Sequence, residues 1–241
     1  MNAQHAGARA FAWAGAVLFA GALAYFLFSY SVTFGEIGTG EIGRRDIAID
    51  VALFSVFALH HSIFARLPVR ALVQRTVAAK LERSVYVWIA SLMLIGVCYL
   101  WRSLPGTLWQ VTAPWSWALA AVQVVGVWLT LRSAAVIDGL DLAGVRPLLT
   151  PNVQPPTPKT EPLEFKTAGP YGWVRHPIYL GWIVIVFSVG TMTMTRLVFA
   201  AVSTVYLLIA IPFEERTIRA QSAAYADYMR KVPRKLIPRI Y

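Results

Sequence analysis

Six apolar segments divide the chain, and they leave no room for a sizeable soluble domain. A helix needs about 20 consecutive apolar residues to cross a bilayer. Hydrophobic residues make up 57% of the 241 residues, whereas charged residues make up only 14%. The sequence therefore predicts an all-α integral membrane protein with five to six transmembrane helices. The segments comprise residues 10–32, 47–65, 84–101, 114–136, 178–191 and 196–213.

The last two segments are predicted to form a helical hairpin. Segment 178–191 is short for a spanning helix, and Gly190 with the run of threonines and methionines at 191–195 leaves only a tight turn before the next segment. Both ends of this hairpin lie on the same side of the membrane, whether or not its tip crosses.

The basic residues predict the orientation of the chain. If the N-terminus is cytoplasmic and every segment crosses, eighteen of the 22 lysines and arginines lie on the cytoplasmic side. This bias is what the positive-inside rule requires, and it predicts that both termini are cytoplasmic. The net charge of +10 is accordingly interpreted as orientation charge rather than as a surface that binds nucleic acid.

Two polar stretches divide the chain into parts. Residues 66–83 form a basic, amphipathic loop, which either seats a lipid headgroup or rests on anionic lipid. Residues 138–168 form a proline-rich cytoplasmic loop, long enough for a functional cover or a disordered link. We therefore expect N-terminal helices in 1–137, this loop, and a C-terminal module in 169–241.

Three polar clusters lie at one predicted membrane level, next to the cytoplasmic ends of segments two, five and six. Polar groups at bilayer depth are costly, so each needs a partner or a task. Packing of these segments would gather the clusters into one pocket that faces the cytoplasm. The clusters are His60 with His61 and Ser62, Arg175 with His176 and Pro177, and Glu214 with Glu215 and Arg216.

The stretch that leads into segment five has the features of a helix N-terminus. Gly169 and Pro170 favour a turn, Pro177 suits the first helical turn, and Gly181 allows a close approach. A helix N-terminus that carries Arg175 and histidine attracts a carboxylate or a phosphate. The alternative is an interfacial aromatic belt with a snorkelling arginine.

The chain after segment six continues the pattern. Tyr225 and Tyr228 are three residues apart and share a helical face. Glu214 and Glu215 are expected at the C-terminal end of a helix, where they oppose its dipole. Either a ligand cation or neighbouring arginines would compensate these two charges.

The ordered motif resembles a known superfamily. Gly-Pro-Tyr-x-x-x-Arg-His-Pro-x-Tyr-x-Gly at 169–181, the hairpin, Glu-Glu, Tyr-x-x-Tyr and a basic tail that contains proline are similar to the isoprenylcysteine carboxyl methyltransferase and phospholipid methyltransferase superfamily. This match spans roughly 169–238. The N-terminal half resembles the bacterial methanethiol S-methyltransferase and nitrite-reductase-associated membrane protein branch, at 58–66 and 82–86.

The resemblance implies a membrane enzyme of the bacterial inner membrane that uses S-adenosylmethionine. It would transfer a methyl group to a thiol, carboxylate or lipid acceptor at the cytoplasmic face, with a small or lipophilic thiol favoured. Its partners would be membrane lipids and this acceptor, with no nucleic acid and no obligate protein partner. The residues implied to bind the cofactor are Gly169, Pro170, Tyr171, Arg175, His176, Tyr179, Gly181, Glu214 and Glu215.

The chemistry assigns these residue types to distinct tasks. Arg175 pairs bidentately with a carboxylate, and a glutamate pairs with the cofactor's ammonium or ribose hydroxyls. For a thiol acceptor, His60 or His61 is the candidate base, and only one of them faces a given pocket because adjacent helical residues point about 100° apart. For a carboxylate acceptor, Arg175 or Arg234 would orient the oxygen.

Two other classes of function remain open. One is a haem or metal membrane protein that uses His60 or His61 with His176 as ligands. The other is a non-catalytic membrane partner or transporter, although broken-helix repeats typical of transporters are lacking. Because Cys98 is the only cysteine, intramolecular disulfides and cysteine-rich metal sites are excluded, and no metal ligand set is predicted.

Overall fold

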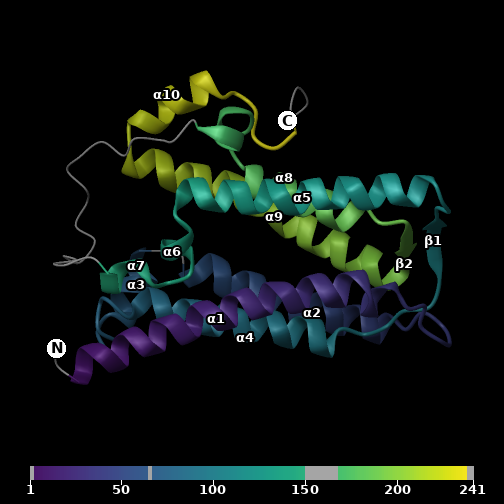
Figure 1. Ribbon diagram of the computed structural model, residues 1–241, viewed down its shortest axis with the longest axis horizontal. Coiled ribbons are helices and arrows are strands. Elements are labelled where there is room, and N and C mark those ends of the chain that lie inside the picture. The colour runs from purple at the N-terminus through teal and green to yellow at the C-terminus, as the bar shows by residue number, and fades with distance from the viewer. Residues whose placement is uncertain (1–2, 65–66, 150–167, 238–241) are drawn as a thin grey trace. The chain divides into compact units, whose positions relative to one another are not determined.

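The computed structural model describes residues 3–64, 67–149 and 168–237, and these residues are mostly helical (Figure 1). Within these ranges, five helices are long and apolar enough to cross a membrane, and α8 is a shorter apolar helix. The predicted helical membrane fold is therefore confirmed. The five are α1 (Ala3–Ser31), α2 (Arg44–Phe64), α4 (Glu82–Leu100), α5 (Trp115–Ile137) and α9 (Met194–Gln221), and α8 spans Pro177–Phe187.

The remaining elements are short. They are η1 (Thr33–Gly35), α3 (Leu67–Val73), β1 (Thr107–Gln110), α6 (Gly139–Leu142), α7 (Arg146–Leu149), η2 (Gly169–Gly172), β2 (Thr191–Thr193) and α10 (Ala224–Lys231).

The chain forms two compact units. The first unit comprises the described residues of 1–105 and 139–155, and the second comprises those of 106–138 and 156–241. This division differs from the one expected from sequence, because α5 groups with the C-terminal residues instead of with the preceding helices. Of the predicted proline-rich loop, residues 150–167 lie outside the described residues.

In the first unit, α1 and α4 run parallel and α2 runs antiparallel to them. Phe11 stacks on Trp88 at a centroid distance of 5.5 Å, which brings the starts of α1 and α4 together. Asp50, near the start of α2, accepts a hydrogen bond from the backbone N–H of Arg102 just after α4 (2.9 Å). The three helices therefore alternate in direction, as three successive crossings require.

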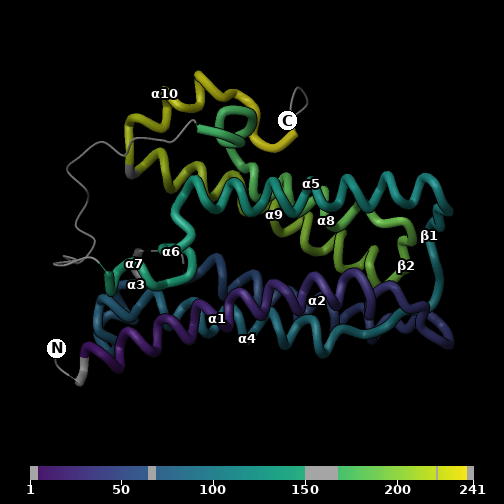
Figure 2. Tube along the Cα trace, viewed as in Figure 1, coloured from purple at the N-terminus to yellow at the C-terminus, as the bar shows by residue number. Residues whose placement is uncertain are grey.

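In the second unit, α8 lies side by side with α5 (Figures 1 and 2). The contact is close because glycines face each other across it. A Cβ atom on Gly181 would lie 2.9 Å from the carbonyl oxygen of Gly126, and one on Gly126 would lie 3.0 Å from the carbonyl oxygen of Gly181. Small residues of this kind let two helix backbones approach within a membrane.

The predicted hairpin is present as α8, β2 and α9. Its tip pairs with the chain that precedes α5: Val111 donates to the carbonyl of Gly190 (2.7 Å), and β1 pairs antiparallel with β2, with Trp109 opposite Met192. The tip therefore reaches the level at which α5 begins. This two-stranded sheet was not predicted from the sequence.

The last membrane helix is longer than the sequence predicted. α9 continues to Gln221, beyond the expected end at residue 213. Glu214 and Glu215 consequently lie inside the helix, more than one turn before its end. The prediction that these two charges oppose the helix dipole is therefore wrong, because the dipole acts on charges in the last turn of a helix.

The described part of the basic loop 66–83 comprises the seven-residue α3, turns and the first two residues of α4. The expected contact of this loop with lipid stays a prediction. Arg70 donates to the buried carboxylate of Glu82 at 3.0 Å, and Gln74 donates to the same carboxylate at 3.1 Å. Arg70 is therefore neutralised by an internal partner, and Arg66 lies outside the described residues.

Candidate active site

A backbone frame positions the charged residues of the second unit. Gly169 begins η2 with a φ of +60°, a conformation that favours glycine. Pro177 is the first residue of α8, as predicted. The two residues before it are held by the C-terminal tail, because Arg175 N–H donates to the carbonyl of Arg234 and His176 N–H donates to that of Lys235, both at 2.9 Å.

A buried ion pair lies at the centre of this frame. Arg175 Nε donates to Glu215 Oε1 at 2.7 Å, and each side chain is only 3% exposed. Arg175 Nη1 also donates to the carbonyls of Val232 (2.9 Å) and Pro233 (2.6 Å). The guanidinium group thus ties α9 and the tail to the start of α8. Arg175 thus pairs with a carboxylate of the chain itself, and its predicted pairing with a carboxylate of a ligand stays a prediction.

His176 lies between the two glutamates of α9. Its Nε2 is 3.2 Å from Glu215 Oε1, and its Nδ1 is 3.7 Å from Glu214 Oε2. Burial lowers the pKa of His176 below its ordinary value, against the raising effect of both glutamates. When the neutral ring donates from Nε2 to Glu215, its Nδ1 is left as an acceptor. Two acceptor atoms, His176 Nδ1 and Glu214 Oε2, therefore face each other.

Glu214 is the outward-facing member of the acidic pair. Its side chain is 43% exposed, and it accepts a hydrogen bond from the hydroxyl of Tyr179. The Tyr179 ring stacks on His176 at a centroid distance of 5.4 Å and an interplanar angle of 15°. Tyr179 therefore fixes both the carboxylate and the imidazole beside it.

Two buried tyrosines of α10 lie next to the ion pair. Tyr225 and Tyr228 are buried with Val232 in one apolar cluster, and the Tyr228 hydroxyl donates to the carbonyl of Tyr171 at 2.9 Å. Burial is the main cause that raises the pKa of Tyr225 and of Tyr228 to about 12, so both hydroxyls stay protonated. Their shared face was predicted, but no sequence signal indicated the carbonyls that complete the frame.

Five of the residues implied to bind the cofactor come together here: Arg175, His176, Tyr179, Glu214 and Glu215. The carbonyl of Tyr171 accepts from the Tyr228 hydroxyl, and burial together with the charge of Glu214 raises the pKa of the Tyr171 phenol, so this side chain also lies near the acidic pair.

The contact with α5 accounts for glycine at position 181. Arg234 contributes its backbone carbonyl to the frame by accepting from Arg175 N–H, whereas its side chain is exposed.

The two histidines of α2 belong to the first unit. The Tyr86 hydroxyl and His61 Nδ1 are hydrogen-bonded at 2.6 Å. The His60 ring lies nearly parallel to the Tyr86 ring, with centroids 5.6 Å apart, and Arg83 lies over that tyrosine ring at 5.2 Å. Among the described residues, no three His, Cys, Asp or Glu side chains form a group that could hold a metal ion.

Comparison with known proteins connects this geometry to a family. Residues 159–223 match the model of the isoprenylcysteine carboxyl methyltransferase (ICMT) family. Methanethiol S-methyltransferase 2 of Bradyrhizobium diazoefficiens is 34% identical over 86% of this chain and 78% of its own length. The chain belongs to the ICMT family. The resemblance inferred from the motif at 169–181 is therefore confirmed.

Other relatives extend the comparison. Methanethiol S-methyltransferase of Mycobacterium tuberculosis is 33% identical over 88% of this chain and 92% of its own length. Nurim of Xenopus laevis is 32% identical over 67% of this chain and 58% of its own length. No solved structure matches. The protein is thus an integral membrane protein of a methyltransferase family.

Proposed function

We propose that this ICMT-family protein is an S-adenosylmethionine-dependent methyltransferase that methylates a small or lipophilic thiol at the cytoplasmic face of the bacterial inner membrane. The names of its bacterial relatives support a thiol as the acceptor. The observation that carries the cofactor assignment is the pair of facing acceptors, Glu214 Oε2 and His176 Nδ1, 3.7 Å apart.

The donor groups of the cofactor fit this pair. Two acceptors at such a separation require a group that presents more than one hydrogen, such as an ammonium or a pair of ribose hydroxyls. Glu214 supplies a negative charge for a cation, and its exposure makes it accessible. Glu214, His176 and Tyr179 would therefore hold the cofactor. When bound, S-adenosylmethionine supplies an electrophilic methyl group on a positively charged sulfur.

The remaining residues keep these groups in place. Glu215 accepts from Arg175 and from His176, which fixes the ring orientation and leaves Nδ1 directed at Glu214. Because the charge of Glu215 is compensated by Arg175, Glu214 is the carboxylate whose charge remains for a ligand. Transfer between a cationic donor and an anionic acceptor loses charge in the transition state, so alignment and exclusion of water are the main contributions the chain would make.

A methyl-transfer assay tests this proposal. Purified protein in detergent or lipid would receive S-adenosylmethionine with a labelled methyl group and a panel of methyl acceptors: methanethiol, a longer alkanethiol, a prenylated thiol and phosphatidylethanolamine. We expect label in the thioether product and little in the lipid. Failure to bind S-adenosylmethionine would overturn the proposal and favour a non-catalytic membrane protein.

The cytoplasmic face is proposed from charge alone. Seven basic residues lie between Arg216 and Arg239, two of them in the last two turns of α9 and five after it, and such a bias marks the cytoplasmic side. A C-terminal fusion to green fluorescent protein should fluoresce, whereas a fusion to alkaline phosphatase should be inactive. The reverse pattern would overturn this orientation.

A further inference from the structure

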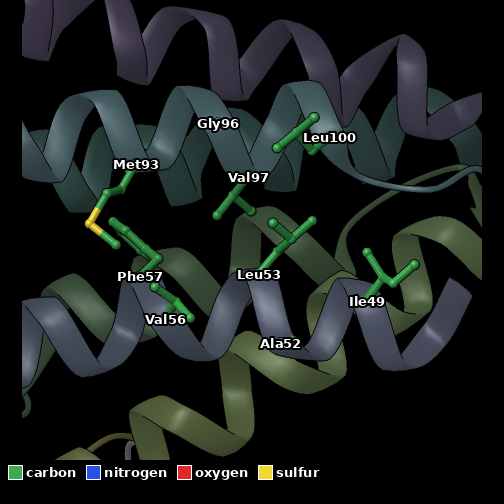
Figure 3. A pocket seen from close by; sticks show the side chains of 9 residues that line it. All are labelled: Ile49, Ala52, Leu53, Val56, Phe57, Met93, Gly96, Val97 and Leu100. Carbon is green, nitrogen blue, oxygen red and sulfur yellow. The ribbon is translucent and has the colours of Figure 1, made fainter. Parts of the chain in front are cut away.

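An apolar groove of about 400 Å³ lies between α2 and α4, within the first unit (Figure 3). It is lined by five residues of 49–57 on α2 and four residues of 93–100 on α4, and none of them carries a polar side chain. Both helices are long and apolar enough to cross a membrane, and Val56 and Leu100 of the lining are exposed. The groove is therefore open at bilayer depth, where lipids are the surrounding molecules.

The helical spacing of this lining leads to a histidine and a tyrosine. On α2 the lining recurs every three or four residues up to Phe57, and His60 is the next position of the same face. On α4, Tyr86 precedes Met93 by two helical turns. The rings of His60 and Tyr86 lie nearly parallel with centroids 5.6 Å apart. These two rings form what we call the polar end of the groove.

His60 is the residue at the polar end whose hydrogen-bonding atoms are unused. Both of its ring nitrogens are buried, and neither has a hydrogen-bond partner within the described part of the chain. His61, in contrast, is bonded to the Tyr86 hydroxyl through Nδ1 at 2.6 Å. A buried polar atom without a partner is unfavourable. A ligand that completes a hydrogen bond to His60 would therefore remove this cost.

The surroundings of His60 select the polar group of such a ligand. An uncharged imidazole has one N–H donor and one acceptor nitrogen, and a hydroxyl group can bond to either of them. A carboxylate or an ammonium group would enter a groove whose lining has no side chain to pair with it, which is costly at bilayer depth. The observations therefore favour an uncharged lipid with a hydroxyl head.

The length of the groove fits a single apolar chain. His60 follows Ile49 by eleven residues, and at 1.5 Å per residue the helix rises about 16 Å between them. The hydrocarbon core of a bilayer is about 30 Å thick, so this distance is about the depth of one leaflet. A lipid with its hydroxyl at His60 would place its chain along the lining toward Ile49.

We propose that this groove binds an uncharged, single-chain lipid whose hydroxyl group is hydrogen-bonded to a ring nitrogen of His60. The imidazole turns about its χ2 bond when the lipid binds, which brings a nitrogen toward the groove. The site lies within the first unit, and it is independent of the cofactor and of the methyl acceptor. Long-chain alcohols and monoacylglycerols share the required chemistry.

A photoreactive probe tests where the lipid binds. The full-length protein in phosphatidylcholine nanodiscs would receive 1-dodecanol with a diazirine in its chain, and peptide mass spectrometry would locate the adducts. We expect them to concentrate in residues 49–57 and 93–100 and to decrease when unlabelled dodecanol is added. The exposed residues Val124 and Val125 of α5 are the internal control, where labelling should be weak and insensitive to dodecanol. Labelling spread evenly over the exposed apolar residues would overturn the proposal.

The hydrogen bond is tested with His60→Phe, which keeps an aromatic ring and removes both nitrogens. Competition against the probe should show about tenfold weaker binding of dodecanol, which corresponds to about 1.4 kcal/mol for one hydrogen bond. Dodecane has the same chain without the hydroxyl, and it should compete equally in the wild type and in the variant. Dodecanoate should compete at least about tenfold less well than dodecanol in the wild type because of its charge.

Folding of this variant is checked by its thermal unfolding. Because the substitution removes a buried polar group without a partner, we expect a cooperative transition at or above the Tm of the wild type. An unchanged affinity of His60→Phe for dodecanol would show that His60 does not hold the hydroxyl, and it would overturn the proposal.

The groove itself is tested by filling it. A Cβ atom on Gly96 would meet no atom within 4 Å, so Gly96→Leu fits sterically and narrows the groove. Binding of dodecanol and of dodecane should both weaken by about tenfold, because less apolar surface is buried on binding. Gly21→Leu, on α1, also has free space around it and is the matched control with unchanged binding. Equal binding to both variants would contradict the placement of the chain in the groove.

The two lipid sources are distinguished in the same competition assay. Monolauroylglycerol and dodecanol have chains of equal length, and the one that displaces the probe at the lower concentration identifies the preferred head. Displacement by either one supports the proposal, whereas displacement by neither overturns it. Because these assays contain no S-adenosylmethionine, their outcome does not depend on the proposed methyl transfer.

Discussion

Replacing Glu215 with glutamine should destabilise the second unit substantially. The substitution leaves the buried guanidinium of Arg175 without its counterion, although both side chains are only 3% exposed. Removing one partner of a buried ion pair costs about 3–5 kcal/mol. Glutamine keeps an oxygen that can accept from Arg175 and His176, so we expect a loss near the lower limit, about 3 kcal/mol. For a chain of this length, that loss corresponds to a decrease in Tm of about 6–12 °C.

Thermal unfolding followed by far-UV circular dichroism in one detergent measures this effect. Glu214→Gln is the matched control, because it removes the same charge from a side chain that is 43% exposed, and its Tm should stay within about 2 °C of the wild type. The double variant Arg175→Met with Glu215→Leu should be less destabilised than the two single variants together, by about 2 kcal/mol. A Tm for Glu215→Gln within about 2 °C of the wild type would refute the buried-pair framework.

Three further predictions follow from individual contacts. Folding stability should fall as the pH drops below about 6.5, because the unfolded state then binds a proton that the buried His176, with its lowered pKa, does not bind; a thermal stability that is the same at about pH 7.5 and about pH 5.5 would contradict this. S-adenosylmethionine affinity should fall at lower pH than stability does, where His176 of the folded protein is protonated and loses its acceptor atom. Gly181→Ala would place a Cβ 2.9 Å from the carbonyl of Gly126 and should cost about 1–3 kcal/mol, whereas Gly21→Ala, with free space, should lose nothing in the same thermal melt. Tyr228→Phe removes the hydrogen bond to η2 and should lower the free energy of unfolding by about 1 kcal/mol, read from denaturant unfolding.

Local signals made much of the fold predictable. Apolar length located the helices, and Pro177 marked the start of α8. The pairing of β1 with β2 was not predictable, because each strand is only three or four residues long and the pairing joins distant parts of the chain. The C-terminal extension of α9 was missed because Glu, Arg, Ala and Gln favour helix without contributing to an apolar segment.

The composition of the candidate site could be predicted, but the roles within it could not. The motif indicated that arginine, histidine and two glutamates would meet, and the second unit brings them together. Glu214 and Glu215 are adjacent and point about 100° apart on α9, so only the structure distinguishes the exposed carboxylate from the buried one. The carbonyls of Val232 and Pro233 that engage Arg175 belong to the backbone, which leaves no signal in side-chain patterns.

The most direct test of the account is the affinity for S-adenosylmethionine, measured by isothermal titration calorimetry with the wild type, Glu214→Gln and Asp227→Asn. Asp227 is an exposed carboxylate of α10 paired with Arg230, and its substitution changes the charge by the same amount. We predict saturable binding to the wild type and to Asp227→Asn, and a 10- to 100-fold weaker Kd for Glu214→Gln, which is about 1.5–3 kcal/mol for a charge-assisted hydrogen bond. Equal affinities for all three proteins would contradict the assignment of Glu214 and His176 as the cofactor-binding pair.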